Sequence, residues 1–304
     1  MKKLILLLAT GFFCLNTNAQ TDTALVAIND TIPAVPDTVR VGKRDTLRIG
    51  NILIIKKAGD KNRKEVVVAN GSTEPKKSSR VTTNWWIVDL GFANYSDQTD
   101  YSSVGNFLVN RPGAPALNSH DFKLNAGKSV NVNIWFFMQR LSLIKRNVNL
   151  KYGLGLEMNN YRYKSAITYR ENGVVPYSGG METNAPFIFR DSIAFSKNKL
   201  AADYLTVPLM LNFRTTPGAG KKSLSVSFGV SAGYLYSQRN KQKSDDRGKQ
   251  KNKGDYDLNR FKFSYVGELG LGPVKLFGSY SPKSMFDNNM DFRPYSFGIR
   301  LGNL

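Results

Sequence analysis

Apolar residues alternate with polar or small residues over much of the chain from residue 85 onward. In the clearest run Val130, Val132, Ile134 and Phe136 share one face, and a Ser, two Asn and a Trp occupy the other. A period of two residues is typical of a strand whose faces meet different environments. Eight such runs lie at 86–92, 130–136, 148–158, 205–213, 224–234, 261–271, 274–280 and 295–301. The pattern therefore predicts an all-β domain of eight strands.

The length and spacing of these runs favour a membrane barrel over a soluble sandwich. Most runs are about as long as a tilted strand that crosses a bilayer, and longer than the ~5–6 residues usual in globular sheets. Long connections alternate with short ones, as they do between the two ends of an outer-membrane barrel. A sandwich explains the alternating residues but not the alternating connections. We predict an eight-stranded antiparallel transmembrane β-barrel of the outer-membrane type over residues 85–304.

Charged residues of both signs fall on the face that would line the lumen. An eight-stranded barrel is only wide enough for side chains to fill its interior, so opposite charges there should pair. We interpret them as a structural ion network rather than a transport pathway. The predicted lumen residues are Asp89, Lys151, Glu157, Lys262, Glu268, Lys275 and Arg300.

Aromatic residues concentrate near the ends of the predicted strands, where a barrel carries its two interfacial girdles. With the first strand starting in the periplasm, the inner girdle contains Trp85, Trp86 and Trp135. The outer girdle contains Tyr95, Tyr161, Tyr163, Tyr204, Tyr234, Tyr236, Tyr280 and Tyr295.

The first residues have the features of a secretory signal peptide. Lys2 and Lys3 precede an apolar run at 4–13, and Thr17-Asn18-Ala19 is a small-residue cleavage site. We predict a signal peptide at 1–19, whose removal takes away the only Cys. The apolar run is too short to cross a bilayer.

Residues 20–84 have another composition, with Pro, Thr and Asp and without aromatic residues up to 84. They predict a flexible periplasmic extension that contains short β segments. One segment repeats, as DTVRVG at 37–42 and DTLRIG at 45–50. Such segments could pair with one another, add to the edge strand of a partner, or form a β-prone linker.

Three stretches of the predicted barrel carry specific motifs: 139–144 leading into LKYGLGLE at 150–157, NKL at 198–200 before YLTVPL at 204–209, and the closing YSFGIRL at 295–301. In these stretches the chain resembles the PorT-like outer-membrane β-barrel family of the Bacteroidetes. The stretch YLTVPL is the most specific, because Pro208 removes a donor from the strand ladder. The resemblance covers about 85–304 and implies an eight-stranded outer-membrane barrel. The ending at 300–304 differs from the terminal aromatic residue of many such barrels.

The formal net charge is +20, from 43 Lys and Arg against 23 Asp and Glu. Secretion argues against nucleic acid as the partner, so we expect outer-membrane lipid, lipopolysaccharide or an envelope protein that contacts the outer loops or the N-terminal extension. The predicted periplasmic turns carry Arg140, Lys145, Arg146, Arg214, Lys221 and Lys222. The outer loop at 239–259 is dense in Lys, Arg, Asp and Gly, which favours a mobile, solvated loop over one that contacts lipid A phosphates or a surface polyanion. The second outer loop is expected to be ordered, for example as hairpin extensions of the third and fourth strands, because it contains Val174, Val175, Tyr177, Phe187, Ile188, Phe189, Ile193 and Phe195.

The sequence offers little for enzyme chemistry. One Cys and one His exclude a Cys-based zinc site and a His-pair metal centre, and no cofactor is expected. Ser119, His120 and Asp121 contain the residue types of a hydrolase, but three consecutive side chains cannot readily converge as a triad. We therefore expect a non-enzymatic structural or interaction protein of the outer membrane. A component of a secretion or surface-assembly system is a more specific version of this role. The alternative is a lipid-modifying outer-membrane hydrolase.

Overall fold

The computed structural model describes residues 80–215, 224–272 and 274–302, together with the backbone of 40–41, 44–49, 52–57 and 65–67. The chain divides into two compact units, residues 1–78 and 79–304. The predicted signal peptide, 1–19, lies outside the described residues.

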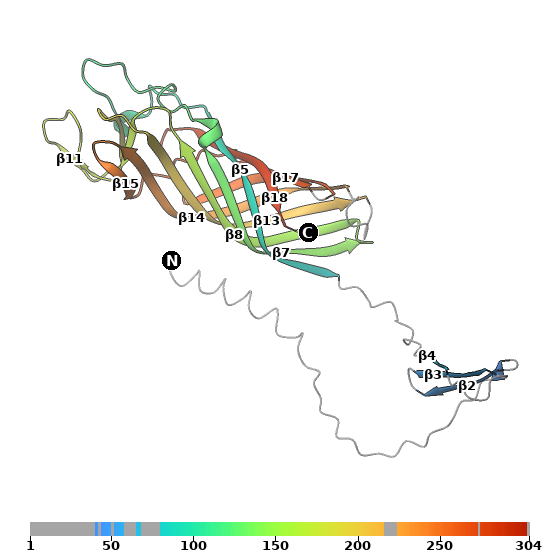
Figure 1. Ribbon diagram of the computed structural model, residues 1–304. Helices are drawn as coiled ribbons and strands as arrows, with labels where there is room; N and C mark the ends of the chain where they lie inside the picture. Colours follow the sequence, from blue (N-terminus) through green and yellow to red (C-terminus); the bar gives the residue numbers. More distant parts are fainter. Residues whose placement is uncertain are drawn as a thin grey trace, which may run out of the picture. The chain divides into compact units, whose positions relative to one another are not determined.

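The second unit is a closed antiparallel β-barrel (Figure 1). Its eight strands are β5 (Val81–Asp97), β7 (Val130–Ile144), β8 (Val148–Arg162), β13 (Lys197–Arg214), β14 (Leu224–Ser244), β16 (Phe261–Leu271), β17 (Val274–Tyr280) and β18 (Phe292–Leu301). Each strand pairs with the next one in this series, and β18 pairs with β5 to close the ring. This confirms the predicted fold class, although β5 starts before residue 85 and β13 and β14 extend well beyond their predicted loop ends.

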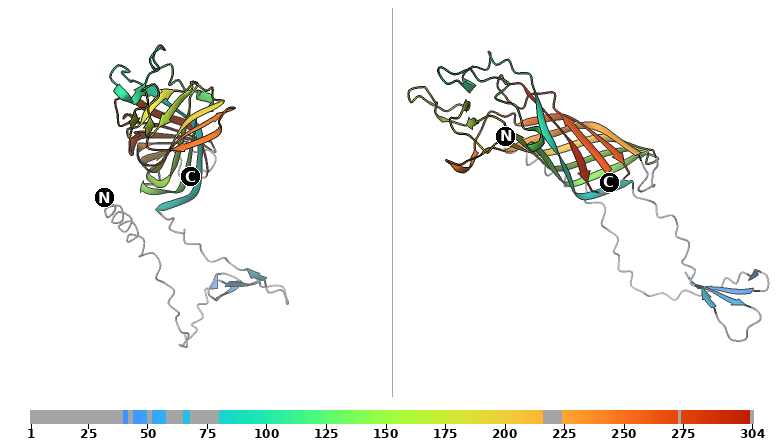
Figure 2. Two further views of the ribbon diagram at one scale, coloured as in Figure 1. Left: turned by 90° about the vertical axis from the view of Figure 1, so that its left-hand side faces the viewer. Right: turned by 45° about the horizontal axis from the view of Figure 1, so that its top comes forward.

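The long connections all leave the same end of the barrel, here called the loop end (Figure 2). They span 98–129, 163–196, 245–260 and 281–291, whereas 145–147, 215–223 and 272–273 connect the strands at the opposite, turn end. The alternation of lengths read from the sequence thus corresponds to the two ends of the barrel.

The outer surface of the barrel is apolar between these ends. Along β13, Leu205, Val207 and Leu209 are exposed while Thr206 and Met210 are buried. Half-buried apolar residues on the outward positions of β7 and β8, such as Ile134 and Leu154, complete an apolar belt with exposed residues on the other strands. The exposed members are Leu90, Phe92, Leu211, Phe213, Leu224, Val226, Phe228, Val230, Phe261, Phe263, Tyr265, Leu269, Leu271, Val274, Leu276, Phe297, Ile299 and Leu301. A continuous apolar belt on a closed barrel is the surface that lipid chains cover.

Among the described residues, no helix has the length and apolar character that crossing a bilayer requires.

The loops contain further β structure. β6 (Leu108–Val109), β12 (Phe187–Arg190) and β9 (Ile167–Arg170) form a three-stranded sheet in which β12 is parallel to β6. β10 (Gly173–Val174) and β11 (Glu182–Thr183) form a small hairpin. The second outer loop is therefore ordered. β8 and β13 extend beyond their predicted ends to Arg162 and Lys197, and residues between them form separate short strands. Two 3-10 turns, η2 (Gly105–Phe107) and η3 (Ala126–Lys128), lie in the first loop.

The third loop differs from the mobile segment expected from its composition. β14 continues to Ser244, and β15 (Gly248–Lys253) turns back and pairs with it from Arg239 to Ser244. Composition alone did not reveal this hairpin, because backbone pairing that continues from an existing strand does not need apolar side chains.

In the first unit the described backbone forms one antiparallel sheet in the order β1 (Arg40–Val41), β2 (Arg44–Ile49), β3 (Ile52–Lys57) and β4 (Glu65–Val67). Of the three arrangements that the sequence allowed, these segments adopt pairing with one another.

Candidate functional site

Four of the charged residues that alternation places in the lumen form a connected group. Arg300 on β18 donates from Nε to Asp89 Oδ1 at 2.6 Å and from Nη2 to Asp89 Oδ2 at 2.8 Å. Its Nη1 contacts Glu268 on β16, and Glu268 also pairs with Lys151 on β8. The side chains of all four are at most 9% exposed. Charges removed this far from water need partners, and each of these has at least one.

A second ion pair lies on the same network. Glu157 on β8 pairs with Lys262 on β16. Asn159 donates to Glu157 Oε1 at 3.0 Å, and Asn131 donates to Asn159 at 2.8 Å and to Asn133 at 3.1 Å. Asn133 then donates to the aspartate of the first group at 3.3 Å. Asparagines on β7 and β8 therefore join the two groups of charges into one network.

Lys275, the seventh predicted lumen residue, lies opposite Arg300 in the register of β17 and β18. It is half-buried at the turn end, where its Nζ donates to the carbonyl oxygen of Gly302 at 3.1 Å. The other six residues are three acids and three bases, so the paired lumen charges sum to zero.

Little space remains beside the network. The cavity beside the network, which Trp135, Met210 and Phe277 also line, has a volume of about 30 Å³. A volume of that size has room for about one water molecule. The side chains thus close the lumen at this depth.

Five of the aromatic residues assigned to the girdles lie inside the barrel instead. They are Trp135, Tyr95, Tyr161, Tyr163 and Tyr204. Trp135, Tyr95, Tyr161 and Tyr204 occupy inward positions of their strands, whereas Tyr163 follows the end of β8 in the second loop. Successive side chains of a strand point to opposite faces, so nearness to a strand end fixes depth but not direction. The indole Nε1 of Trp135 donates to Asp89 Oδ2 at 2.7 Å, which makes it part of the lumen network.

The other predicted girdle residues face outward or lie partly exposed. Trp85 and Trp86 are both exposed, although adjacent strand residues normally face opposite sides. Trp86 has a positive φ of 56°, and this local break in the strand turns both indoles toward the lipid side. Tyr234, Tyr236 and Tyr280 are exposed, and Tyr295 is half-buried.

An aromatic cap closes the loop end of the lumen. Tyr95 stacks on Phe292 at a centroid distance of 4.3 Å, and Phe122 lies 5.3 Å from Phe292. The hydroxyl groups of Tyr163 and Tyr169 are 2.6 Å apart, and burial raises the pKa of Tyr169 well above its usual value. The buried cap also contains Val104, Phe107, Leu108, Leu117, Tyr161, Ile167, Ile188, Leu200, Tyr204, Leu235, Tyr256, Leu258, Met285, Phe286 and Met290. Sequence reasoning missed this cap, for which the available signal was the apolar residues of the first and fourth loops.

The hydrolase residue types in the first loop do not converge. Ser119 and His120 are exposed, whereas Asp121 is buried and receives three hydrogen bonds from the guanidinium of Arg190, at 2.8–3.0 Å. The carboxylate therefore ties the first loop to β12 and does not orient the imidazole. Among the described residues, His, Cys, Asp and Glu side chains form no group of three that could hold a metal ion.

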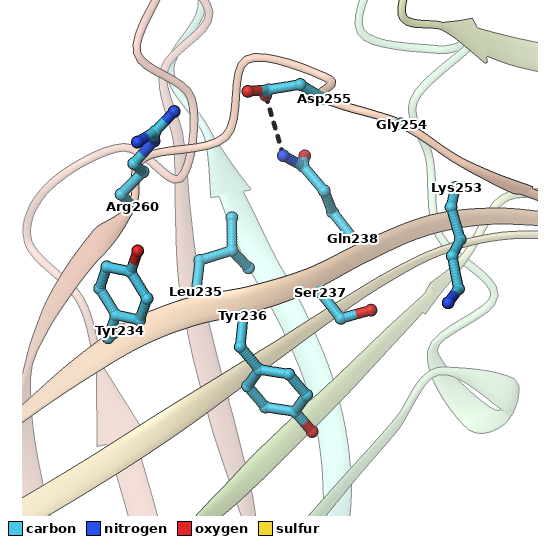
Figure 3. Close-up of a pocket in the computed structure, with 9 residues that line it drawn as sticks. All are labelled: Tyr234, Leu235, Tyr236, Ser237, Gln238, Lys253, Gly254, Asp255 and Arg260. Carbon is cyan, nitrogen blue, oxygen red and sulfur yellow. Dashed lines mark hydrogen bonds between the residues drawn. The ribbon is translucent and has the colours of Figure 1, made fainter. Parts of the chain in front are cut away.

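An open groove of about 350 Å³ lies on β14 at the upper edge of the apolar belt (Figure 3). Tyr236 is an extra residue in β14, because the pairing with β13 shifts from Asp203 opposite Ser237 to Tyr204 opposite Leu235. Across the groove Gln238 donates to Asp255 Oδ1 at 2.9 Å, and the remaining wall carries Lys253 and Arg260. The groove thus combines aromatic and cationic side chains.

Comparison with known families agrees with this architecture. Residues 86–298 match the family model described as outer membrane protein beta-barrel domain. No curated protein matches the sequence. The matched span covers more than half of the chain, from the first barrel strand into the last. The chain therefore belongs to the outer membrane protein beta-barrel domain family.

Proposed function

We propose that this outer-membrane β-barrel protein is a closed, non-conducting barrel with a structural or interaction role in the cell envelope. The observation that carries the proposal is the lumen of the described barrel, where a paired ion network with a cavity of about 30 Å³ beside it lies beneath an aromatic cap. Such an interior offers no path for ions or solutes. The surfaces left for function are the outer wall and the ordered loops, where binding residues commonly lie.

The proposal is tested by conductance in planar bilayers, with a general porin reconstituted in parallel as the positive control. Folded protein is identified beforehand by a heat-modifiable shift on SDS gels. We expect no stable open level, and a reproducible single-channel level from the folded protein would refute the closed barrel.

We also propose that the protein is not a hydrolase. The engagement of Asp121 by Arg190 supports this, because it leaves His120 without an orienting carboxylate. The test is hydrolysis of lipid A or phospholipid by the wild type and by His120→Ala. Turnover that disappears in the variant would revive the hydrolase alternative.

We propose further that the protein is a PorT-like member of its family, with a cleaved signal peptide at 1–19 and a periplasmic extension at 20–84. The stretch YLTVPL at 204–209 supports the PorT-like assignment. The periplasmic extension is supported by β5, which begins at the turn end of the barrel, where the short connections also lie. Single cysteines test the topology in a chain without Cys14. A membrane-impermeant maleimide should label Asp246→Cys in intact cells, but Lys145→Cys only in lysed cells, and the reverse pattern would overturn the orientation.

A partner could bind through the loops or through the extension, and a secretion or surface-assembly complex is one such case. Crosslinking and pull-down of the full chain would show a stoichiometric envelope protein if this role is correct.

A further inference from the structure

The extended loop-end segments of neighbouring strands carry an outward surface of basic residues. This basic face consists of Arg162, Lys197, Lys199, Arg239, Lys241, Lys243, Lys249, Lys251 and Lys253. The register arranges it in rows across the strands: Lys199 lies opposite Lys241, which lies opposite Lys251. Residues opposite one another in a sheet share a face, so the rows form a lattice of cations.

The buried positions of the same strands show that this lattice faces outward. Asn198, Asn240 and Gln242 alternate with the lysines and are buried. Asn198 donates to the carbonyl oxygen of Ile167 at 2.6 Å, and Gln242 donates to Thr168 Oγ1 at 2.8 Å. The inner face of the extension is therefore packed against β9. The extra residue Tyr236 produces this arrangement, because it moves the outward positions of β14 from even to odd numbers.

The cations of the basic face have almost no acidic partners. Within the described part of the chain, Arg239 is the member that forms an ion pair, with Asp203. Like charges directly opposite one another destabilise a sheet. Burial, and next the neighbouring cations Lys197 and Lys241, lower the pKa of Lys199 to about 8. The repulsion between these cations opposes folding, and a bound polyanion would relieve it.

The height of the basic face above the apolar belt discriminates between anionic partners. Ala201, which lies opposite Arg239, is four residues above Leu205 on β13, and Lys197 is eight residues above it. With a rise of ~3.3 Å per residue and a strand tilt of ~40°, the rows lie about 10 Å to about 20 Å above the belt. The headgroup layer of a phospholipid bilayer extends only about 5–8 Å beyond its hydrocarbon core. Phosphates of ordinary phospholipids would therefore lie below most of the face.

We propose that the basic face binds the phosphorylated sugars of an outer-leaflet glycolipid of the lipopolysaccharide class. Such a lipid places its acyl chains against the apolar belt and carries phosphate groups above the phospholipid headgroups. The groove between Tyr236 and Arg260 connects the two regions, with Lys253 on its wall (Figure 3). This inference rests on the proposed membrane-embedded role, with the loop end in the outer leaflet.

The test measures lipopolysaccharide binding to the full chain in nanodiscs for the wild type and for Lys241→Gln/Lys243→Gln/Lys251→Gln. Each lysine near a membrane surface contributes about a fivefold change in affinity, so the triple variant should bind on the order of 100-fold more weakly. Lys123→Gln/Lys128→Gln/Lys164→Gln is the matched control, since it removes the same charge from exposed loop positions outside the face. The control should bind like the wild type, and the corresponding triple arginine variant of the face should retain binding.

Further arms distinguish the sources of phosphate. Lipopolysaccharide treated with phosphatase, vesicles of phosphatidylglycerol and a soluble acidic polysaccharide should each bind the wild type weakly and without dependence on the face. Equal binding by the wild type and the glutamine variant, equal loss in the control variant, or tight binding of phosphatidylglycerol or the polysaccharide would overturn the proposal. The heat-modifiable gel shift verifies that each variant is folded, and conductance of the wild type reports on the closed barrel independently of these results.

Discussion

The lumen network predicts a specific pattern of stability losses, which centres on Arg300. This residue gives Asp89 two charge-assisted hydrogen bonds, at 2.6 and 2.8 Å, and Asp89 is fully buried. Arg300→Met leaves that carboxylate with neutral donors and gives the lumen one net negative charge. Removing one member of a buried ion pair costs about 3–5 kcal/mol of unfolding free energy. Glu268 keeps Lys151, so most of the loss arises at Asp89.

The double variant Asp89→Asn/Arg300→Met restores neutrality, because one charge of each sign is removed. Replacing both members of a buried pair is often close to neutral, so we expect the double variant to lie within about 1–2 kcal/mol of the wild type. The two single losses should each be about 3 kcal/mol or more, which gives a coupling energy of several kcal/mol.

The assay is reversible urea unfolding in lipid vesicles, followed by the fluorescence of Trp135 and by the heat-modifiable gel shift. Because Trp85 and Trp86 would obscure the signal, the cycle is measured in a Trp85→Phe/Trp86→Phe background. Additive losses in the double variant would refute the argument that pairing, rather than packing, holds these residues in the lumen.

Three further predictions follow from close packing, loop contacts and charge. Gly298→Ala should destabilise the barrel by about 3 kcal/mol, because the added Cβ would lie 2.2 Å from a backbone carbonyl oxygen of β5. Gly267→Ala is the control and should cost little, because its Cβ would meet the nearest atom at 3.8 Å. Equal midpoints of the two variants in urea unfolding would contradict this prediction. Asp121→Asn should speed proteolysis of the outer loops while the barrel keeps its gel shift, because it removes the charged partner of Arg190; unchanged cleavage rates would show that this contact does not order the loops. Burial and neighbouring cations lower the pKa of Lys199 to about 8 in the folded protein, and the unfolded chain keeps this proton to a higher pH. The free energy of unfolding should therefore rise from pH 8 to 10.5. Lys199→Gln should flatten this rise, and an unchanged slope would exclude Lys199 as its source.

Local alternation predicted the strands well, because a two-residue period records the difference between the lipid side and the lumen side at each position. For the same reason it placed Asp89 and Arg300 on the inner face. It could not assign Tyr161 or Tyr204 correctly when their nearness to a strand end was used in place of their parity.

The remaining features depend on contacts between distant parts of the chain. Phe122 of the first loop meets Phe292, the first residue of β18, in the cap, and neither segment has a local pattern that indicates the other. The pairing of β15 with β14 was equally hidden, because a polar sequence such as 248–253 gives no local sign of a backbone partner. Irregularities at Trp86 and Tyr236 each change which side chains face out, and single residues of this kind leave no periodic signal.

The bulge at Tyr236 makes β14 a strand with two reading frames. Below it, even-numbered positions are selected for contact with lipid; above it, odd-numbered positions are selected for charge, while β13 keeps one frame throughout. Deleting this one residue would turn the upper segment over, so that Lys241 and Lys243 pointed at β9 and the buried amides of Asn240 and Gln242 faced outward. The bulge thus lets one continuous strand present apolar residues to lipid on one side of Tyr236 and charged residues to water on the other. We expect insertions and deletions in β14 to be tolerated least at this position.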